Sequence, residues 1–443
     1  MRQRFMIYSG KNCCRKARLE VCSLLMCIGA ILVCSSVALA QSDKSNEISK
    51  LKQLCDQKKY FELRDAVESY RGKRDARLLF FRGALANSFN EPRVSMKYLN
   101  QYIARAVADD EWLSDAYTML ADDFVKMYDY GRASDTYRTI LDRFKQRLKP
   151  DEIEDYENSA TFYGSLREVP RQRVTLGQAA RLNEPSSEAG WNVPVWANNQ
   201  RVSLGLDTGA NVSLLAKSVA ERLGVKMLNK SISVGSITSI KVQPKLGLLP
   251  TMKIGNATIH NAVFIILDDE ALTFPDGFVL KGVIGFPIIA GLRKISFNGD
   301  GTVSGSGRSS GRGRPSMSLD GRNILFQGEY ENKRLTFMLD TGAERSVLYA
   351  PFLHDFEDEI RSKYSQRTEK FTGVGGTEEV PAYIVKDFAV SFDGKSVRLP
   401  EIRLLTKVLN DNSKFYYGNV GQDLIKRFHR MTLDFDSMRI AFE

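Results

Sequence analysis

The stretch GLDTGANVSLL (residues 205–215) returns in altered form as MLDTGAERSVL (residues 338–348) within a chain of 443 residues. Each copy places Asp-Thr-Gly-Ala directly after a leucine and shortly before a small apolar run. A surface turn can carry Asp-Thr-Gly once by chance, but two copies in the same local setting indicate a repeated structural unit. The fold of this part of the chain should therefore follow from how the two copies pack together.

The similarity between the copies continues well beyond these two stretches. When Asp207 is aligned with Asp340, GVIGFPIIAGLRKISF (residues 282–297) falls over GNVGQDLIKRFHRMTL (residues 418–433). The matched positions keep their apolar character, which a chance match would not do. We therefore expect two copies of one fold, each of about 130 residues.

The second part of the chain has the sequence pattern of a β protein. Short runs rich in Val, Ile, Leu and Phe alternate with glycine-bearing turns from about residue 169 onward. A Gly-, Ser- and Arg-rich stretch interrupts them and favours a flexible connection. These patterns predict a first lobe over residues 169–300, a flexible linker over residues 301–318 and a second lobe over residues 319–443.

Residues 41–168 have a helical pattern, with few Pro or Gly residues and apolar residues recurring every three or four positions. The segment at residues 116–141 predicts two amphipathic helices and resembles a tetratricopeptide (TPR) repeat. The small and aromatic packing residues of that repeat are matched by Ala121, Phe124, Ala133 and Tyr137. Three roles stay open for this region: a structural scaffold, a docking surface for a protein partner, or a pro-segment.

The first 40 residues have the pattern of an export signal peptide. A basic head precedes an uncharged stretch at residues 21–40, and Ala-Leu-Ala at residues 38–40 is a suitable cleavage site. Cleavage would leave an exported protein, in a bacterial periplasm or secreted, without stable membrane association. The alternative is a membrane anchor formed by residues 21–40.

Charge and cysteine content agree with export. The signal segment holds six basic residues and one acid, so its removal lowers the formal net charge from +10 to +5. A mildly basic chain of this kind gives no reason to expect a nucleic-acid partner. Five of the six cysteines lie in the same segment, so the mature chain keeps only Cys55 and no internal disulfide.

An apolar strand that ends in Asp-Thr-Gly-Ala, followed later by two apolar residues and a glycine, resembles the aspartic peptidases. The later element is Val283-Ile284-Gly285 in the first copy. The alanine after Asp-Thr-Gly and the compact copies are closer to the retropepsin-like branch, although both halves lie in one chain, as they do in pepsin. The resemblance covers about residues 173–443. It implies a multidomain protein, with an all-α helical-repeat part before a mainly β bilobal peptidase fold of two pseudo-twofold related lobes.

The resemblance also implies roles for individual residues. Asp207 and Asp340 would form a catalytic dyad that shares one proton, because two carboxyl groups about 3 Å apart cannot both ionise. Support of the active-site turns is expected from Thr208, Gly209, Ala210, Thr341, Gly342 and Ala343, and apolar-glycine support from Ile284, Gly285, Val420 and Gly421. Hairpin flaps over bound peptide are expected around Gly235, Gly373, Gly375 and Gly376.

These features predict an exported aspartic endopeptidase that cleaves extended peptide or protein substrates. No metal or other cofactor is expected, since the three histidines are widely separated. Ala210 and Ala343 stand where pepsin-like enzymes have a hydroxyl group, which predicts a mildly acidic optimum. Two departures from the family pattern, Asn419 and Gly205, leave an alternative open: a peptide-binding protein with a peptidase-like cleft and weak or no catalysis.

Overall fold

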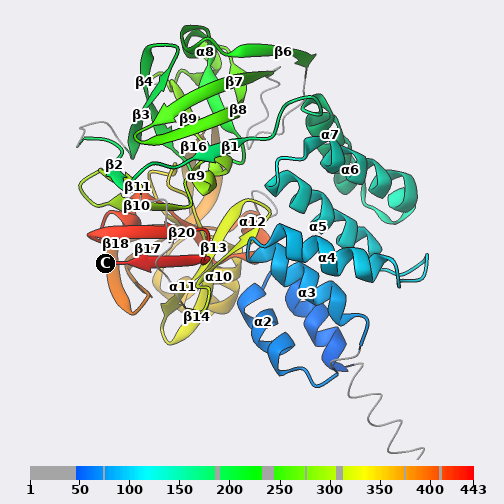
Figure 1. The fold of residues 1–443 in the computed structure, drawn as a ribbon. Coiled ribbons are helices and arrows are strands. Elements are labelled where there is room, and N and C mark those ends of the chain that lie inside the picture. The colour runs from blue at the N-terminus through cyan, green and yellow to red at the C-terminus, as the bar shows by residue number, and fades with distance from the viewer. Residues whose placement is uncertain are drawn as a thin grey trace, which may run out of the picture.

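The structure is a computed structural model that describes residues 46–72, 75–184, 190–231, 244–274, 277–305, 313–373, 376–408 and 412–443. It consists of an N-terminal helical array beside a β-rich region of two lobes (Figure 1). The export signal expected at residues 1–40 lies outside the described residues. Within the ranges given above, no helix combines the length and the apolar character that crossing a membrane requires.

The helical array is built from consecutive helices that bury their apolar faces against one another. Residues 46–56 are helical, and they are followed by α2 (Tyr60–Ser69), α3 (Leu78–Ser88), α4 (Pro92–Ile103), α5 (Leu113–Lys126), α6 (Tyr130–Phe144), the short 3-10 helix η1 (Lys145–Arg147) and α7 (Pro150–Ser165). The turn predicted within residues 116–141 lies between α5 and α6. Ala121 and Ala133 are fully buried there, so close helix packing explains the small residues at these positions.

One acid of this array, Asp123, is buried in surroundings that disfavour its ionised form. Asp123 of α5 is fully buried, and Asn87 Nδ2 donates a hydrogen bond to its Oδ1 at 2.8 Å. Burial raises the pKa of Asp123 to about 7, against the opposing effects of Ser95, Lys126 and Asn87. The folded state therefore holds the proton of Asp123 more tightly than the unfolded state does. The folded protein loses stability as the pH rises from about 4 to about 7, because the unfolded state releases this proton first.

Asp123→Asn is therefore expected to stabilise the protein at pH 8 by about 2–4 kcal/mol and to change little at pH 4. The amide mimics the protonated acid. At high pH it removes the free-energy cost of either keeping the proton on Asp123 or burying its charge. Thermal unfolding at the two pH values measures the difference. Asp142→Asn on the exposed side of α6 is the matched control and should show no such pH dependence. Equal effects of Asp123→Asn at both pH values would contradict the assignment.

The first lobe is a closed ring of six strands. The order around the ring is β8-β5-β9-β4-β3-β7, with β7 pairing back to β8, and β1 and β6 lie at its margins. The strands are β1 (Arg173–Thr175), β3 (Asn192–Ala197), β4 (Gln200–Leu206), β5 (Ser213–Ala216), β6 (Lys226–Ser231), β7 (Lys245–Ile254), β8 (Ala257–Leu267) and β9 (Gly282–Ile284). Two helices, α8 (Lys217–Leu223) and α9 (Phe286–Gly291), and the 3-10 helix η2 (Asp269–Leu272) complete it.

The second lobe is a ring with the same strand order. Its strand order is β18-β15-β19-β14-β13-β17, with β17 pairing back to β18, and β12 and β16 lie outside the ring. The strands are β12 (Met317–Asp320), β13 (Asn323–Tyr330), β14 (Lys333–Leu339), β15 (Val347–Leu348), β16 (Arg367–Gly373), β17 (Gly376–Phe392), β18 (Lys395–Leu405) and β19 (Gly418–Val420). The helices are α10 (Ala350–Asp355), α11 (Glu357–Lys363), α12 (Asn412–Phe415) and α13 (Gln422–Ile425). Two rings of equal order are what two copies of one unit would form.

A five-stranded sheet joins the lobes. Its order is β2-β11-β10-β20-β21, with β2 (Ala180–Arg181), β11 (Val303–Gly305), β10 (Lys294–Asn298), β20 (Arg430–Asp434) and β21 (Arg439–Phe442). Ser296 pairs with Thr432 at its centre, and their hydroxyl oxygens lie 2.8 Å apart. The sequence repeat aligns these same two residues. Equivalent positions of the repeat therefore meet at the centre of this sheet.

The flexible linker predicted for residues 301–318 is too wide. Strand β11 lies at its start and β12 begins at Met317. Val303 and Met317 are fully buried, so packing into the core fixes both ends despite the Gly- and Ser-rich composition between them.

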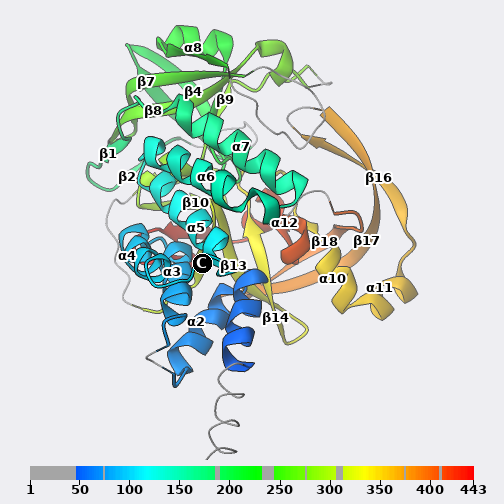
Figure 2. The ribbon, with the colours of Figure 1, turned by 90° about the vertical axis from the view of Figure 1, so that its right-hand side faces the viewer.

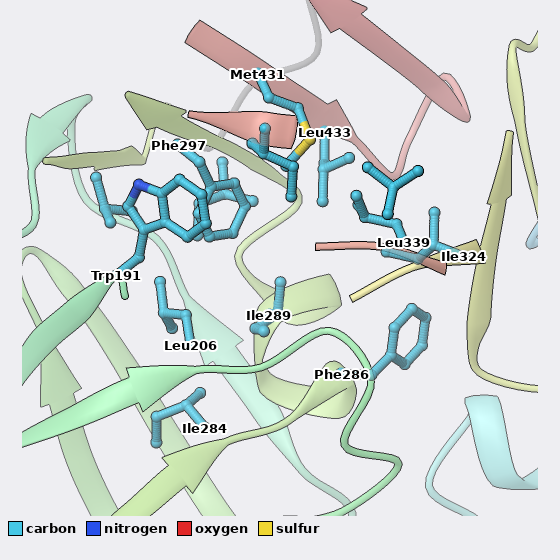
Figure 3. Packing of buried hydrophobic residues seen from close by; sticks show 14 of the residues in the cluster. Trp191, Leu206, Ile284, Phe286, Ile289, Phe297, Ile324, Leu339, Met431 and Leu433 are labelled. Atoms are coloured by element: carbon cyan, nitrogen blue, oxygen red, sulfur yellow. The ribbon is translucent and has the colours of Figure 1, made fainter. Parts of the chain in front are cut away.

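A continuous hydrophobic core connects the two lobes beneath the central sheet (Figure 3). Trp191 and Phe297 of the first lobe meet edge to face with ring centroids 5.3 Å apart. Leu339 and Met431 of the second lobe belong to the same buried cluster. The lobes therefore form one packed body, and this rigidity positions what lies between them.

The helical array is docked on both lobes through buried contacts. Figure 2 shows it lying across them. Its apolar cluster includes residues of both β rings, namely Leu246, Val263, Leu325 and Met338. A shared apolar interface of this kind resists separation, so the array and the two lobes are held together.

A polar anchor accompanies the apolar contact. Asp320 of β12 forms an ion pair with Lys58 at 3.0 Å and accepts hydrogen bonds from the hydroxyl groups of Tyr60 and Tyr416 at 3.2 and 2.7 Å. Burial alone would raise the pKa of Asp320, but Lys58 and the two hydroxyl groups hold it below its usual value. The charge is thus satisfied at the junction of the array and the second lobe.

Candidate active site

The two aspartates stand at equivalent ends of equivalent strands. Asp207 follows β4 and Asp340 follows β14, and each backbone N–H donates to the strand that crosses behind it. The acceptors are the Ile284 and Val420 carbonyl oxygens, both at 3.0 Å. The parallel pairs β4–β9 and β14–β19 thus fix where each aspartate leaves the sheet.

Each aspartate is oriented by its own turn. Asp207 Oδ1 accepts hydrogen bonds from the N–H groups of Gly209 and Ala210 at 2.8 and 3.0 Å. In the second lobe, the N–H groups of Gly342 and Ala343 donate to Asp340 Oδ1 at 2.9 and 3.0 Å. Both carboxyl groups remain partly exposed, so a substrate and a water molecule could reach them.

Two buried threonines cross-link the turns. The Thr208 N–H donates to Thr341 Oγ1 at 3.0 Å, and the Thr341 N–H donates to Thr208 Oγ1 at the same distance. Each hydroxyl group then donates to the opposite lobe, Thr208 to the Leu339 carbonyl oxygen at 3.2 Å and Thr341 to that of Leu206 at 2.8 Å. This reciprocal network holds the two turns at a fixed separation.

The glycines of the turns lie directly against the opposite carboxyl group. A Cβ atom placed on Gly342 would lie 2.4 Å from Asp207 Cγ, and one placed on Gly209 would lie 2.7 Å from Asp340 Cγ. No side chain fits at such distances, so only glycine allows this approach. The structure therefore brings Asp207 and Asp340 face to face across the lobe boundary.

The apolar-glycine segments, residues 283–285 and 419–421, pass behind the aspartate turns. Gly285 and Gly421 approach the backbone of the turns so closely that an added Cβ would lie 2.6 and 2.7 Å from the carbonyl oxygens of Ala210 and Ala343. Ile284 and Val420 are buried beside them.

Sequence reasoning missed a pair of serines in this support. Ser213 and Ser346 are buried and accept hydrogen bonds on Oγ from the N–H groups of Gly285 and Gly421 at 3.0 and 2.9 Å. Both stand six positions after their aspartate, at matched positions of the repeat. The conservation of serine at this position in both copies of the repeat could have indicated its role from the sequence.

Asn419 is the clearest difference between the two halves. It stands where the first lobe has Val283, and its Nδ2 donates a hydrogen bond to Asp340 Oδ2 at 3.1 Å. The side chain is 7% exposed. The sequence suggested that a polar residue here loosens the support, but the amide is used as a partner of the carboxylate. Among the described residues, Asp207 receives no equivalent side-chain donor.

Gly205 does not weaken the packing either. A Cβ atom added there would find its nearest neighbours at 3.6 Å in Asn192 and 3.8 Å in Val283, which are ordinary contact distances. The position is therefore accommodated without a clash or a large void, and it offers no structural reason to doubt the site.

The environment of Asp207 favours its protonated form. Burial, followed by the charge of Asp340, raises the pKa of Asp207 to about 7, although the Gly209 and Ala210 N–H groups act in the opposite direction. Two carboxyl groups placed against each other hold one proton between them over a wide pH range.

The expected flaps fall partly on described residues. Gly373 and Gly376 pair with each other at the end of the hairpin formed by β16 and β17, which extends from the second lobe toward the level of the first (Figure 2). Gly235 and Gly375 lie outside the described residues. The first lobe has the corresponding hairpin in β6 and β7.

Comparison with known proteins adds one match. No curated protein matched this chain. A family model described as aspartyl protease matches residues 193–288, a range that contains the first aspartate turn and the strand behind it. Residues 193–288 therefore carry an aspartyl protease family domain.

Proposed function

We propose that this protein is an aspartic endopeptidase whose catalytic dyad consists of Asp207 and Asp340. The observation that supports this most strongly is the reciprocal threonine network, which holds the two aspartate turns opposite each other with the glycine of each turn against the opposite carboxyl group. Two carboxyl groups in such contact are suited to sharing a proton and activating a water molecule between them.

The asymmetry at Asn419 supports an assignment of roles within the dyad. An amide N–H donor stabilises an ionised carboxylate, so Asp340 would carry the charge. Asp207, whose pKa is raised, would carry the proton. Asp340 then takes a proton from the water as it attacks the scissile carbonyl carbon, and Asp207 donates its proton to the carbonyl oxygen. The tetrahedral diol collapses as Asp340 passes its proton to the leaving amine and Asp207 takes back a proton from the diol.

The pH profile of cleavage should fall on the basic side near neutrality. The reaction needs one proton on the pair, and the pKa of Asp207 is about 7. Activity is therefore lost as the pH rises through that value and is kept below it until the second carboxyl group is also protonated. A profile of kcat/KM from pH 2 to 9 measures this, and full activity at pH 9 or a maximum below pH 3 would contradict it.

Asn419→Val should move only the acidic limb of that profile. The substitution installs the residue of the first lobe and removes a donor from the ionised carboxylate. A hydrogen bond to a charged group is worth about 1.5–3 kcal/mol, so the acidic limb should move up by roughly one to two pH units. The basic limb should move little, because the donor stabilises Asp340 equally on both sides of it.

A loss of activity without movement of the acidic limb would mean that Asn419 is merely structural. Asn419→Asp would place a third carboxyl group at the site and should be far more damaging than the valine. Together, the two variants separate the electrostatic role from packing.

The substrate class proposed is an extended peptide or protein segment that lies between the lobes under the two hairpins. Extended backbone can pair with strand edges, and hairpins with glycine at their ends can open and close. We also propose export, on the charge and cleavage pattern of residues 1–40. A protein partner on the helical array is proposed as well, since helical arrays of this kind present extended surfaces.

The proposal is tested by incubating the purified protein with a peptide library from pH 3 to 8, with and without a pepstatin-type diol mimic. Cleavage of internal bonds that the mimic suppresses is the expected result. Retention of peptide without cleavage at any pH would favour the peptide-binding alternative.

A further inference from the structure

A cavity of about 190 Å³ lies where the three parts of the chain meet. It is not part of the dyad. The helical array, the first lobe and the second lobe contribute to its wall through Tyr130, Tyr163, Val212, Phe286 and Arg322. Because all three parts line it, anything bound there would contact the array and both lobes at once.

The wall is mainly apolar and aromatic. The rings of Tyr130 and Tyr163 are stacked, with their centroids 6.0 Å apart and an angle of 10° between their planes. Polar groups in the wall are largely engaged already. The Tyr128 hydroxyl and Gln172 Nε2 both donate to the Pro287 carbonyl oxygen, at 2.8 and 3.0 Å.

Of the two cations in this wall, one is compensated. Lys126 forms an ion pair with Asp122 at 2.7 Å and donates to the Asn87 carbonyl oxygen at 2.8 Å. Arg322, between β12 and β13, lies with its guanidinium carbon 6.0 Å from the centre of the Tyr163 ring. Within the part of the chain that the structure describes, Arg322 has no ion pair with a carboxylate; its charge is balanced by a hydrogen bond to Tyr163 and by attraction to Asp122, the acid that Lys126 also engages. Asp122 therefore serves two cations, and an anion in the cavity would give Arg322 a carboxylate partner of its own.

We propose that this cavity binds a small organic monoanion, a carboxylate attached to an aromatic or branched apolar body. The guanidinium group of Arg322 would pair with the carboxylate through two parallel hydrogen bonds. The body would lie against the rings of Tyr130, Tyr163 and Phe286. The size fits, since an apolar cavity of about 150 Å³ is enough for a benzene-sized ligand.

The bound anion would also touch the support of the first aspartate turn. Val212 stands two residues after Ala210, and the Phe286 N–H donates to the Ala210 carbonyl oxygen at 2.9 Å. A ligand held between Arg322 and these residues would fasten the array to both lobes. It should therefore raise the unfolding temperature of the whole protein.

The test is binding of benzoate to the purified protein, measured by calorimetry and by thermal unfolding, beside two matched probes. Benzamide has the same body without charge, and acetate has the charge without the body. The expected result is saturable binding of benzoate with a higher unfolding temperature, and at least tenfold weaker effects of benzamide and acetate. Equal binding of benzoate and benzamide, or no binding of benzoate, would overturn the proposal.

Arg322→Gln should weaken benzoate binding at least tenfold, whereas Arg334→Gln, on the exposed face of β14, should leave it unchanged. If Arg322→Gln fails to fold, the comparison of benzoate with benzamide on the parent protein still decides the matter. Because the readout is binding, the result does not depend on whether the dyad cleaves peptides.

Discussion

Asp207→Asn and Asp340→Asn should each lower kcat/KM for peptide cleavage by about 10³- to 10⁴-fold, at every pH from 3 to 8. An amide can neither take a proton from water nor share one with the opposite carboxyl group. Each single substitution therefore abolishes the catalytic function of the whole pair. The oxygen that accepts the two turn N–H groups is kept in both variants, so the turns should remain in place.

The folded state provides the control for this prediction. Neither variant should unfold at a lower temperature than the parent, because an amide next to the remaining carboxyl group removes repulsion between like charges. Peptide binding should persist in both. If one variant kept most of its activity, catalysis would rest on a single aspartate, and the shared dyad would be wrong.

Gly342→Ala is expected to cost about 10²- to 10³-fold in kcat/KM, because a displacement of about 1 Å in catalytic groups has effects of this size. Its Cβ would lie 2.4 Å from Asp207 Cγ and 2.5 Å from the nearer carboxyl oxygen. The turns cannot separate to make room, since the crossed threonines hold them. The carboxyl group of Asp207 must therefore turn away from Asp340.

Gly205→Ala is the matched control for Gly342→Ala, with the same change two residues before Asp207. Its nearest neighbours would be 3.6 Å away, so activity should stay within about twofold of the parent. Gly209→Ala should resemble Gly342→Ala from the opposite side. Full activity in Gly342→Ala would mean that the two turns are farther apart than the structure places them.

The parts of the site that could be predicted from the sequence are those that occur in both copies of the repeat. Asp207, Thr208 and Gly209 recur as Asp340, Thr341 and Gly342, and the chemistry of a shared proton explains each residue type. Local sequence is enough here, because the aspartates, hydroxyl groups and glycines act within one turn and its copy.

What the sequence could not supply depends on contacts between distant strands. The role of Asn419 follows from its place on β19 beside β14, which brings its amide to Asp340 from 79 residues away. Composition suggested a free linker at residues 301–318, but pairing of β11 with β10 buries Val303. The docking of the helical array likewise rests on apolar contacts with strands far along the chain.

The central claim is that Asp207 and Asp340 act as one unit, and a double-variant cycle tests it most directly. The rate of cleavage of the best library peptide is compared for the parent, Asp207→Asn, Asp340→Asn and the double variant at pH 5. The account predicts that the double variant is no slower than either single variant within about threefold, since either change already disables the pair. Losses that multiply in the double variant would show two independent contributions and would contradict a shared dyad.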